Sequence, residues 1–90
     1  MTVTFEVTFS ASARRALTDT LPENVAVAAF EFIMGALRAD PKRMGKQLEE
    51  PLFPLYSARR GEYRIVYRVL DRLLVIDIVA IAHRRDAYRS

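Results

Sequence analysis

The chain has 90 residues, no cysteine, a net charge of +3 and 51% hydrophobic residues. These values exclude a disordered chain, a disulfide scaffold and thiolate chemistry, and they predict one domain over residues 1–90 that buries roughly 60% of the surface of its unfolded chain. The most apolar stretch, "LLVIDIVAIA", contains an aspartate and is too short to cross a bilayer, and no signal peptide is visible. We therefore expect a cytoplasmic protein with no membrane partner.

The charge is unevenly distributed along the chain. Residues 1–40 carry a net charge of −2, whereas residues 41–90 carry +5. The basic half is expected to attract a polyanion or an acidic protein partner. The alternative is a basic surface that is merely solvated, because electrostatic attraction alone does not identify a partner.

The N-terminal half predicts a strand followed by two helices. The stretch "TVTFEVTFS" alternates as a half-buried strand does. A short helix over "ASARRALTDT" follows, capped by Ser10 or Ser12. A second, amphipathic helix begins near Pro22 and ends at Asp40, before a proline. The short connection between the two helices indicates an αα-hairpin.

The C-terminal half predicts a loop and then strands. Residues 41–55 contain three of the four prolines and indicate a surface loop, with a strand possible near its end. The stretches "EYRIVYRVL" and "LLVIDIVAIA" indicate two strands joined as a hairpin. The expected fold class is α+β. Two N-terminal helices form an αα-hairpin packed on one face of a small antiparallel β-sheet, in the order β-α-α-β-β-β.

A two-residue turn at Asp71-Arg72 would set the register of this hairpin, so that the numbers of paired residues sum to 143. One face is then apolar and meets the helices, while the other carries Arg64, Arg68 and Asp77. Asp77 would lie diagonal to both arginines. An ion network of these three residues that keeps the face soluble is therefore an alternative to a functional surface.

The segments "YSARRGEYRIVYRV" and "AIAHRRDAY", together with Gly45, Lys46 and Leu48, resemble the RelE-type toxins of bacterial toxin–antitoxin systems, in the RelE/ParE superfamily. The resemblance covers nearly the whole chain. It implies a toxin that cleaves mRNA in the ribosome by attack of the 2′-OH on the adjacent phosphate. Such an endoribonuclease uses no metal and no cofactor, which agrees with a sequence that has one histidine and no cysteine.

The resemblance also implies roles for individual residues. Arg64 is expected to bind phosphate and stabilise the transition state, and Arg84 to stabilise charge or donate a proton. Tyr88 is expected to stack on a base or take part in proton transfer, and His83, placed on the Arg64 face, to act as general acid or base. Other basic residues are expected to bind RNA: Lys46, Arg59, Arg60, Arg68 and Arg85.

One feature departs from the family pattern. The best-known relatives have two lysines on the strand before the hairpin, and the aligned positions here are Leu55 and Ser57. Either Lys46, Arg59 and Arg60 substitute for them, or the enzyme is slow, or nuclease activity has been lost. Two further alternatives are purely structural: His83 caps the end of a strand, and Tyr88 is a packing residue.

The resemblance implies a set of partners. These are a cognate antitoxin that covers the basic site, the ribosome and mRNA, with DNA contacted only indirectly through the antitoxin. Two other functions are compatible with the same fold. One is a ParE-like inhibitor of DNA gyrase, and the other is a catalytically degenerate RelE-like binding module.

Overall fold

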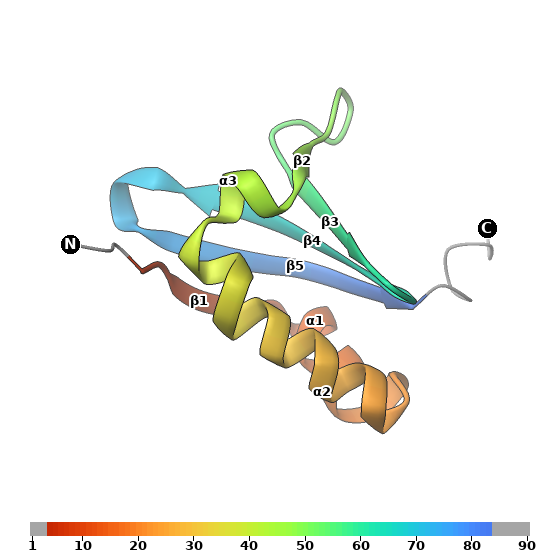
Figure 1. Cartoon of the computed structure of the whole chain (residues 1–90). Helices are drawn as coiled ribbons and strands as arrows, with labels where there is room; N and C mark the ends of the chain where they lie inside the picture. The colour runs from red at the N-terminus through yellow and green to blue at the C-terminus, as the bar shows by residue number, and fades with distance from the viewer. Residues whose placement is uncertain (1–3, 84–90) are drawn as a thin grey trace.

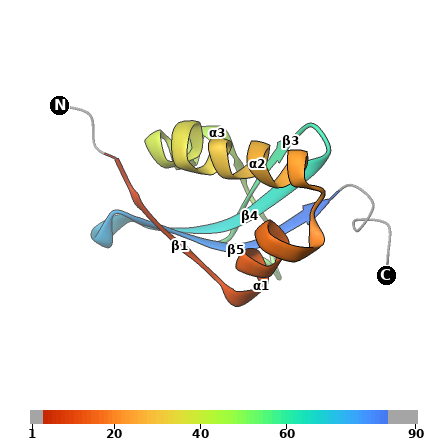
Figure 2. The ribbon, with the colours of Figure 1, turned by 90° about the horizontal axis from the view of Figure 1, so that it is seen from below.

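The computed structural model describes residues 4–83, so the predicted site residues Arg84, Arg85 and Tyr88 lie outside the described residues. In chain order the elements are β1 (Glu6–Phe9), α1 (Ala11–Arg15) with a π-helical continuation (Ala16–Thr20), α2 (Glu23–Phe32) with a second such continuation (Ile33–Leu37), α3 (Pro41–Met44), β2 (Lys46–Gln47), β3 (Tyr56–Arg60), β4 (Tyr63–Leu70), a 3₁₀ turn (Asp71–Leu73) and β5 (Val75–His83). The predicted α+β class and the helical hairpin are confirmed, with α2 over one side of the sheet and α1 beside β5 (Figures 1 and 2).

The residues Ser10 and Pro22 explain where the helices α1 and α2 begin. The Ser10 hydroxyl accepts a hydrogen bond from the backbone N–H of Ala13 at 3.0 Å, which caps α1 as one of the two predicted serines should. The same hydroxyl donates to the carbonyl oxygen of Val79 at 2.6 Å, so the cap also ties α1 to β5. Pro22 directly precedes α2, where its missing N–H has no helical partner to lose.

The sheet is mixed rather than purely antiparallel, which corrects the predicted pairing. The described residues form five strands in the order β1-β5-β4-β3-β2, and β1 runs parallel to β5. Parallel neighbours cannot be joined by a tight turn and need a long connection. Here the helical hairpin and the three intervening strands supply it. Residues 41–55, predicted to be a loop, contain the helix α3 and the short strand β2, which is the edge strand beside β3.

The turn between β4 and β5 is longer than predicted. Leu70 pairs with Val75, so the paired numbers near the turn sum to 145 and not to 143. The 3₁₀ turn occupies the intervening chain, and Leu74 closes it with a positive φ of 55°. The observed register of the hairpin therefore differs from the predicted one by two residues. Because side chains alternate with a period of two, this shift leaves the predicted faces of β4 unchanged.

A β-bulge then changes the faces of β5. The register shifts by one between Val66 and Tyr67, which pair with Ala80 and Ile78 respectively. An extra residue on one strand reverses the alternation beyond it. As a result Arg64 pairs with Ala82 instead of Ile81 at the far end of the sheet.

The core lies between the helices and the inward face of β4 and β5. Tyr67 is completely buried, stacks on Tyr56 with ring centroids 5.6 Å apart, and donates a hydrogen bond to the carbonyl oxygen of Pro41 at 2.5 Å. Burial is the main cause that raises the pKa of its hydroxyl above the ordinary value, and Tyr56 adds to it. The other fully buried large side chains are aliphatic: Ile33, Leu37, Ile65, Ile76 and Ile78.

We predict that Tyr67 contributes to unfolding at high pH. Its folded pKa is raised, so its stabilising effect is fully present below the unfolded value of about 10 and is lost as the pH rises through the folded pKa. Tyr67→Phe should cost about 1 kcal/mol at neutral pH, since it leaves the Pro41 carbonyl oxygen without its donor. It should also flatten the fall in stability above pH 10. Chemical denaturation at several pH values measures both effects, and an equally steep alkaline fall in the variant would contradict this account.

Candidate functional site

One face of the sheet is left uncovered by α1 and α2, and we call it the open face. On β4 it carries the residues that alternate with the buried Tyr63, Ile65 and Tyr67. It also carries the residues of the neighbouring strands that pair with them. Among the described residues, four cations lie on it: Lys46, Arg59, Arg64 and Arg68. The predicted placement of Arg64 and Arg68 away from the core is thus confirmed, since both are exposed on a strand whose alternate residues are buried.

Arg59 and Arg64 form a cross-strand pair at the end of the open face near Gly61. They are direct partners in the β3–β4 register, and both are exposed. Like charges directly opposite one another destabilise a sheet. Within residues 4–83, neither guanidinium group has a carboxylate within ion-pair distance. This end of the face therefore presents concentrated positive charge that the described part of the chain does not neutralise.

The predicted ion network of Arg64 with Asp77 does not form. Arg64 pairs with Ala82, five residues along β5 from Asp77, which corresponds to roughly 16 Å of extended strand. Only Arg68 faces Asp77, with its Nη1 atom 3.7 Å from the carboxylate Oδ2 atom. The hydroxyl of Thr8 donates to the other carboxylate oxygen at 3.0 Å. The longer turn causes this outcome, because it places Asp77 directly opposite Arg68 instead of between the two arginines.

Lys46 joins the open face from the short strand β2. It pairs with Ser57, which in turn pairs with Val66 on β4. Ser57 is a position at which RelE-type relatives are expected to carry lysine, so the ammonium group of Lys46 comes from the neighbouring strand opposite that position. Arg59 lies two residues further along β3 on the same face. Lys46, Arg59 and Arg64 thus occupy adjacent rows of the sheet.

Arg60 and His83 lie on the helix side of the sheet, unlike Arg64. The guanidinium carbon of Arg60 lies 4.6 Å from the ring centroid of Phe32, in a cation–π arrangement. His83 pairs with Tyr63, whose hydroxyl donates to a carbonyl oxygen of α2. The prediction that His83 shares the Arg64 face was wrong, because the bulge reverses the alternation of β5 before this residue is reached.

The buried tyrosines of β4 are unsuited to proton abstraction. Burial raises the pKa of Tyr63, an effect that the charge of Arg60 partly opposes. Burial also raises the pKa of Tyr67. Both hydroxyls are committed as hydrogen-bond donors to backbone carbonyl oxygens. They therefore act as core residues, as their position on the apolar face predicts.

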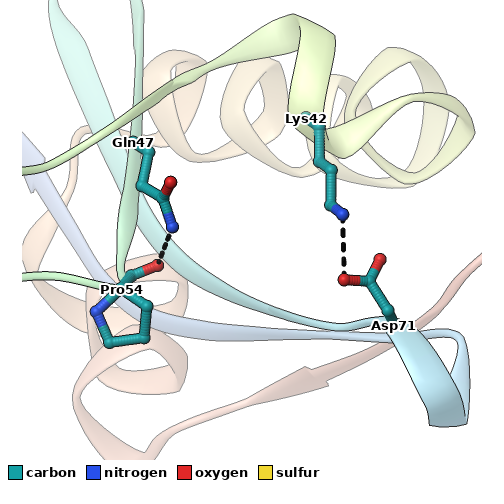
Figure 3. Close-up of polar contacts among 4 residues, drawn as sticks. All are labelled: Lys42, Gln47, Pro54 and Asp71. Carbon is teal, nitrogen blue, oxygen red and sulfur yellow. Dashed lines mark hydrogen bonds and ion pairs between the residues drawn. The ribbon is translucent and has the colours of Figure 1, made fainter.

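Two polar contacts, drawn in Figure 3, and one close approach fix the chain on either side of Lys46. Lys42 on α3 bonds Asp71 at 2.9 Å, which ties α3 to the β4–β5 turn and raises the pKa of the lysine. The side-chain amide of Gln47 donates to the carbonyl oxygen of Pro54 at 3.3 Å and closes the loop after β2. Gly45 packs over the Tyr67 hydroxyl, where no side chain fits.

A second candidate surface is an apolar groove on the helical side. It has a volume of about 490 Å³ and is lined by residues of β1, of α1 and its continuation, and of α2: Phe9, Arg14, Leu17, Thr18, Ala26, Val27, Phe30 and Glu31. Val27 and Phe30 leave 53% and 47% of their surface exposed. The amphipathic pattern of α2 gave no sign of the groove, because the pattern does not show which apolar residues lack a neighbour in the fold.

Residues 4–83 contain neither a membrane-spanning helix nor a cluster of metal ligands. No helix in this part of the chain is long and apolar enough to cross a bilayer. The described side chains also include no cluster of three acidic, histidine or cysteine residues that could hold a metal ion.

The comparisons with known proteins identify the family. Residues 7–88 match the family of the ParE toxin of the type II toxin–antitoxin system parDE. The chain belongs to this toxin family. It is 44% identical to Toxin RelE of Mycobacterium tuberculosis, over 94% of this chain and 87% of that protein. It is 41% identical to Toxin RelG of the same organism, over 94% and 97% of the two chains.

Solved structures agree with this assignment to a RelE-type toxin. A chain of the toxin–antitoxin complex RelBE2 from Mycobacterium tuberculosis superimposes with a TM-score of 0.87 and 40% sequence identity, over 91% of this toxin and 100% of that chain. The resemblance inferred from the sequence is therefore confirmed. The roles expected of the individual site residues stay predictions.

We predict that Gly45 is needed to hold Lys46 on the open face. An alanine Cβ here would collide with the Tyr67 hydroxyl and lie 2.9 Å from the carbonyl oxygen of Ser57, so Gly45→Ala should cost about 1–3 kcal/mol of unfolding free energy. Gly35 is the matched control, because nothing lies within 4 Å of an added Cβ. Gly35→Ala lies within a helical arm and should stabilise the toxin by roughly 0.5–1 kcal/mol. Denaturant titration of both variants tests the pair, and equal effects would contradict it.

Proposed function

We propose that this toxin is a metal-independent endoribonuclease that cleaves mRNA on the ribosome, in the cytoplasm, and so inhibits translation. The observation that carries the proposal is the pair of Arg59 and Arg64 on the open face, which has no carboxylate partner among residues 4–83, with Lys46 in the adjacent row. Guanidinium groups offer planar sets of donors that match the oxygens of a phosphate. Three cations on an uncovered sheet suit an RNA backbone.

The proposed chemistry uses the 2′-OH of the RNA as the nucleophile. The 2′-oxygen bonds to phosphorus while the bond from phosphorus to the 5′-oxygen breaks, which leaves a 2′,3′-cyclic phosphate and a 5′-hydroxyl end. A base takes the 2′ proton and an acid protonates the leaving oxygen. Arg64 and Arg59 stabilise the extra negative charge of the pentacoordinate phosphorane. Lys46 replaces a strand lysine of the relatives by binding the neighbouring phosphate.

The proton-transfer roles are proposed for residues at and beyond the end of β5. Arg84 supplies charge or a proton, Tyr88 stacks on a base or takes part in proton transfer, and Arg85 binds phosphate, all by analogy with the family. His83 lies on the helix side at the last described position, so we propose that it acts from the rim of the sheet rather than from the open face.

The partner of this toxin is proposed to be a cognate antitoxin. The matched RelBE2 structure is a toxin–antitoxin complex. The groove beside α2 is apolar and about half of the surface of Val27 and Phe30 is exposed, as expected for a surface that another chain covers. We propose that an apolar antitoxin segment fills this groove, while DNA is contacted only through the antitoxin.

A second candidate function is inhibition of DNA gyrase. The matching family model is described for the ParE toxin. By analogy, a ParE-type toxin would bind gyrase and would not cut RNA. The open face distinguishes the two functions, because only the nuclease requires Arg64 for phosphate chemistry.

We predict that Arg64→Ala lowers the rate of mRNA cleavage by about 10²–10³-fold, the typical cost of removing one group that stabilises a developing anion. The unfolding free energy should change by less than about 0.5 kcal/mol, since the side chain is exposed. Primer extension on messages from induced cells and on ribosomes in vitro measures cleavage. Arg15→Ala, an exposed arginine on α1, is the matched control and should cut normally.

The same induction separates the alternatives when a gyrase supercoiling assay accompanies it. Codon-linked cuts that disappear in Arg64→Ala support the nuclease. Intact messages with inhibited supercoiling identify a gyrase inhibitor. Intact messages with normal supercoiling identify a degenerate binding module.

We predict that Val27→Lys weakens antitoxin binding by at least roughly tenfold, because a charge would have to be buried against an apolar segment. Leu73→Lys introduces the same side chain at a turn residue that is 70% exposed and lies outside the groove, and it should bind normally. Isothermal titration with the purified antitoxin measures both. Unchanged affinity in Val27→Lys would place the antitoxin elsewhere.

A further inference from the structure

The open face is divided electrostatically into two ends along β4. At one end the charges of Arg59 and Arg64 are unpaired within residues 4–83. At the other end Arg68 faces Asp77, whose carboxylate also accepts the hydroxyl of Thr8. Arg64 and Arg68 lie four residues apart on the same strand, which is roughly 13 Å. That distance exceeds the Debye length of about 8 Å at physiological salt, so the two ends act separately.

The pair of Arg68 and Asp77 contributes little to stability. The two side chains are 47% and 31% exposed, and the closest nitrogen–oxygen distance is 3.7 Å, too long for a charge-assisted hydrogen bond. Exposed pairs of this kind typically contribute about 0–1 kcal/mol. The pair has a larger effect on the charge of the face, because it neutralises one of the four cations.

The position of the Asp77 carboxylate is fixed by a contact other than its pair with Arg68. The Thr8 hydroxyl fixes one carboxylate oxygen at 3.0 Å from β1, and this contact does not depend on the arginine. Glu6 lies two residues before Thr8 on β1, on the same face, and pairs with Val75. The β1 edge of the open face therefore carries negative charge, opposite in sign to the β2–β3 edge.

We propose that Asp77 sets the boundary of the RNA-binding surface: it holds Arg68 in an intramolecular pair and confines the RNA phosphates to the end formed by Lys46, Arg59 and Arg64. The inference rests on the proposed function of the open face in RNA binding. It adds a specificity determinant on β5 and assigns Arg68 a different role from the other three cations. Loss of the carboxylate releases Arg68 and lengthens the phosphate track by one contact.

A double-mutant cycle on Arg68 and Asp77 tests the proposal. The probe is a short 2′-O-methyl oligouridine, which binds as RNA does but lacks the attacking hydroxyl, titrated by fluorescence anisotropy at several salt concentrations. Each phosphate contact contributes about 0.7 to the slope of log affinity against log salt for single strands. Asp77→Asn keeps the shape of the side chain and an oxygen for the Thr8 hydroxyl, so it should fold.

The expected results are specific to each variant. Arg68→Ala alone should leave the salt slope unchanged, and Asp77→Asn should steepen it by about 0.7 and tighten binding. The double variant should return to the wild-type slope. Asp19→Asn, which makes the same charge change at an exposed helical residue, should not steepen it.

Three results would overturn the proposal. They are an Arg68→Ala variant that by itself loses a contact, an Asp77→Asn variant with the wild-type slope, and a steeper slope that persists in the double variant. The last result would mean that Asp77 repels RNA directly. Arg64→Ala run beside them separates this inference from the function on which it rests: a wild-type slope there rejects RNA binding by the open face, whereas a slope reduced by about 0.7 leaves only the Asp77 proposal in question.

Discussion

The arrangement of the open face depends on the hydrogen bond that the buried Tyr67 hydroxyl donates. The ring fills the core beneath the helices, and its hydroxyl must find an acceptor there, because a buried polar group without a partner is costly. The Pro41 carbonyl oxygen is that acceptor. The bond draws the start of α3 onto the sheet, and Gly45 lets the chain pass directly over the hydroxyl so that β2 can pair with β3. Lys46 therefore reaches the open face through a contact made on the opposite side of the sheet.

The buried Tyr63, Ile65 and Tyr67 of β4 also determine which face of the sheet carries the charged side chains. Strand residues alternate, so burial of one set obliges the other to face solvent. The sheet then holds Arg59 and Arg64 opposite one another without a counter-charge in residues 4–83, an arrangement that opposes folding rather than favouring it. The unfavourable term is modest because both groups remain in water. A polyanion would remove it, so binding gains from a repulsion that the folded chain already contains.

The sequence alone predicted which residues of β4 point to each face of the sheet. It did not predict which residues of β5 pair with them. Alternation is a local property, so the inward and outward residues could be assigned without knowledge of the partner strand. The register depends on the turn, and Leu74 adopts a positive φ that nothing in its residue type suggests. The bulge opposite Val66 leaves no mark in the sequence either, and it moved His83 to the helix side. The cation–π contact of Arg60 needs Phe32 from a helix distant in sequence, so the sequence did not show that Arg60 lies on the helix side while the adjacent Arg59 lies on the open face.

The absence of lysine at Leu55 and Ser57 shows why this site is better described by where each charge lies on the sheet than by which residues align. In an antiparallel pair, a residue and its direct partner point to the same face with Cβ atoms about 4.5–5.5 Å apart. The flexible stem of lysine spans more than that distance, so an ammonium group attached to Lys46 can serve the space above Ser57. A comparison of aligned residues shows serine in place of lysine there and suggests that the positive charge has been lost. The electrostatic potential over that part of the face depends on where the charge sits and not on which strand carries it, and a short edge strand that pairs for only two residues is enough to supply it.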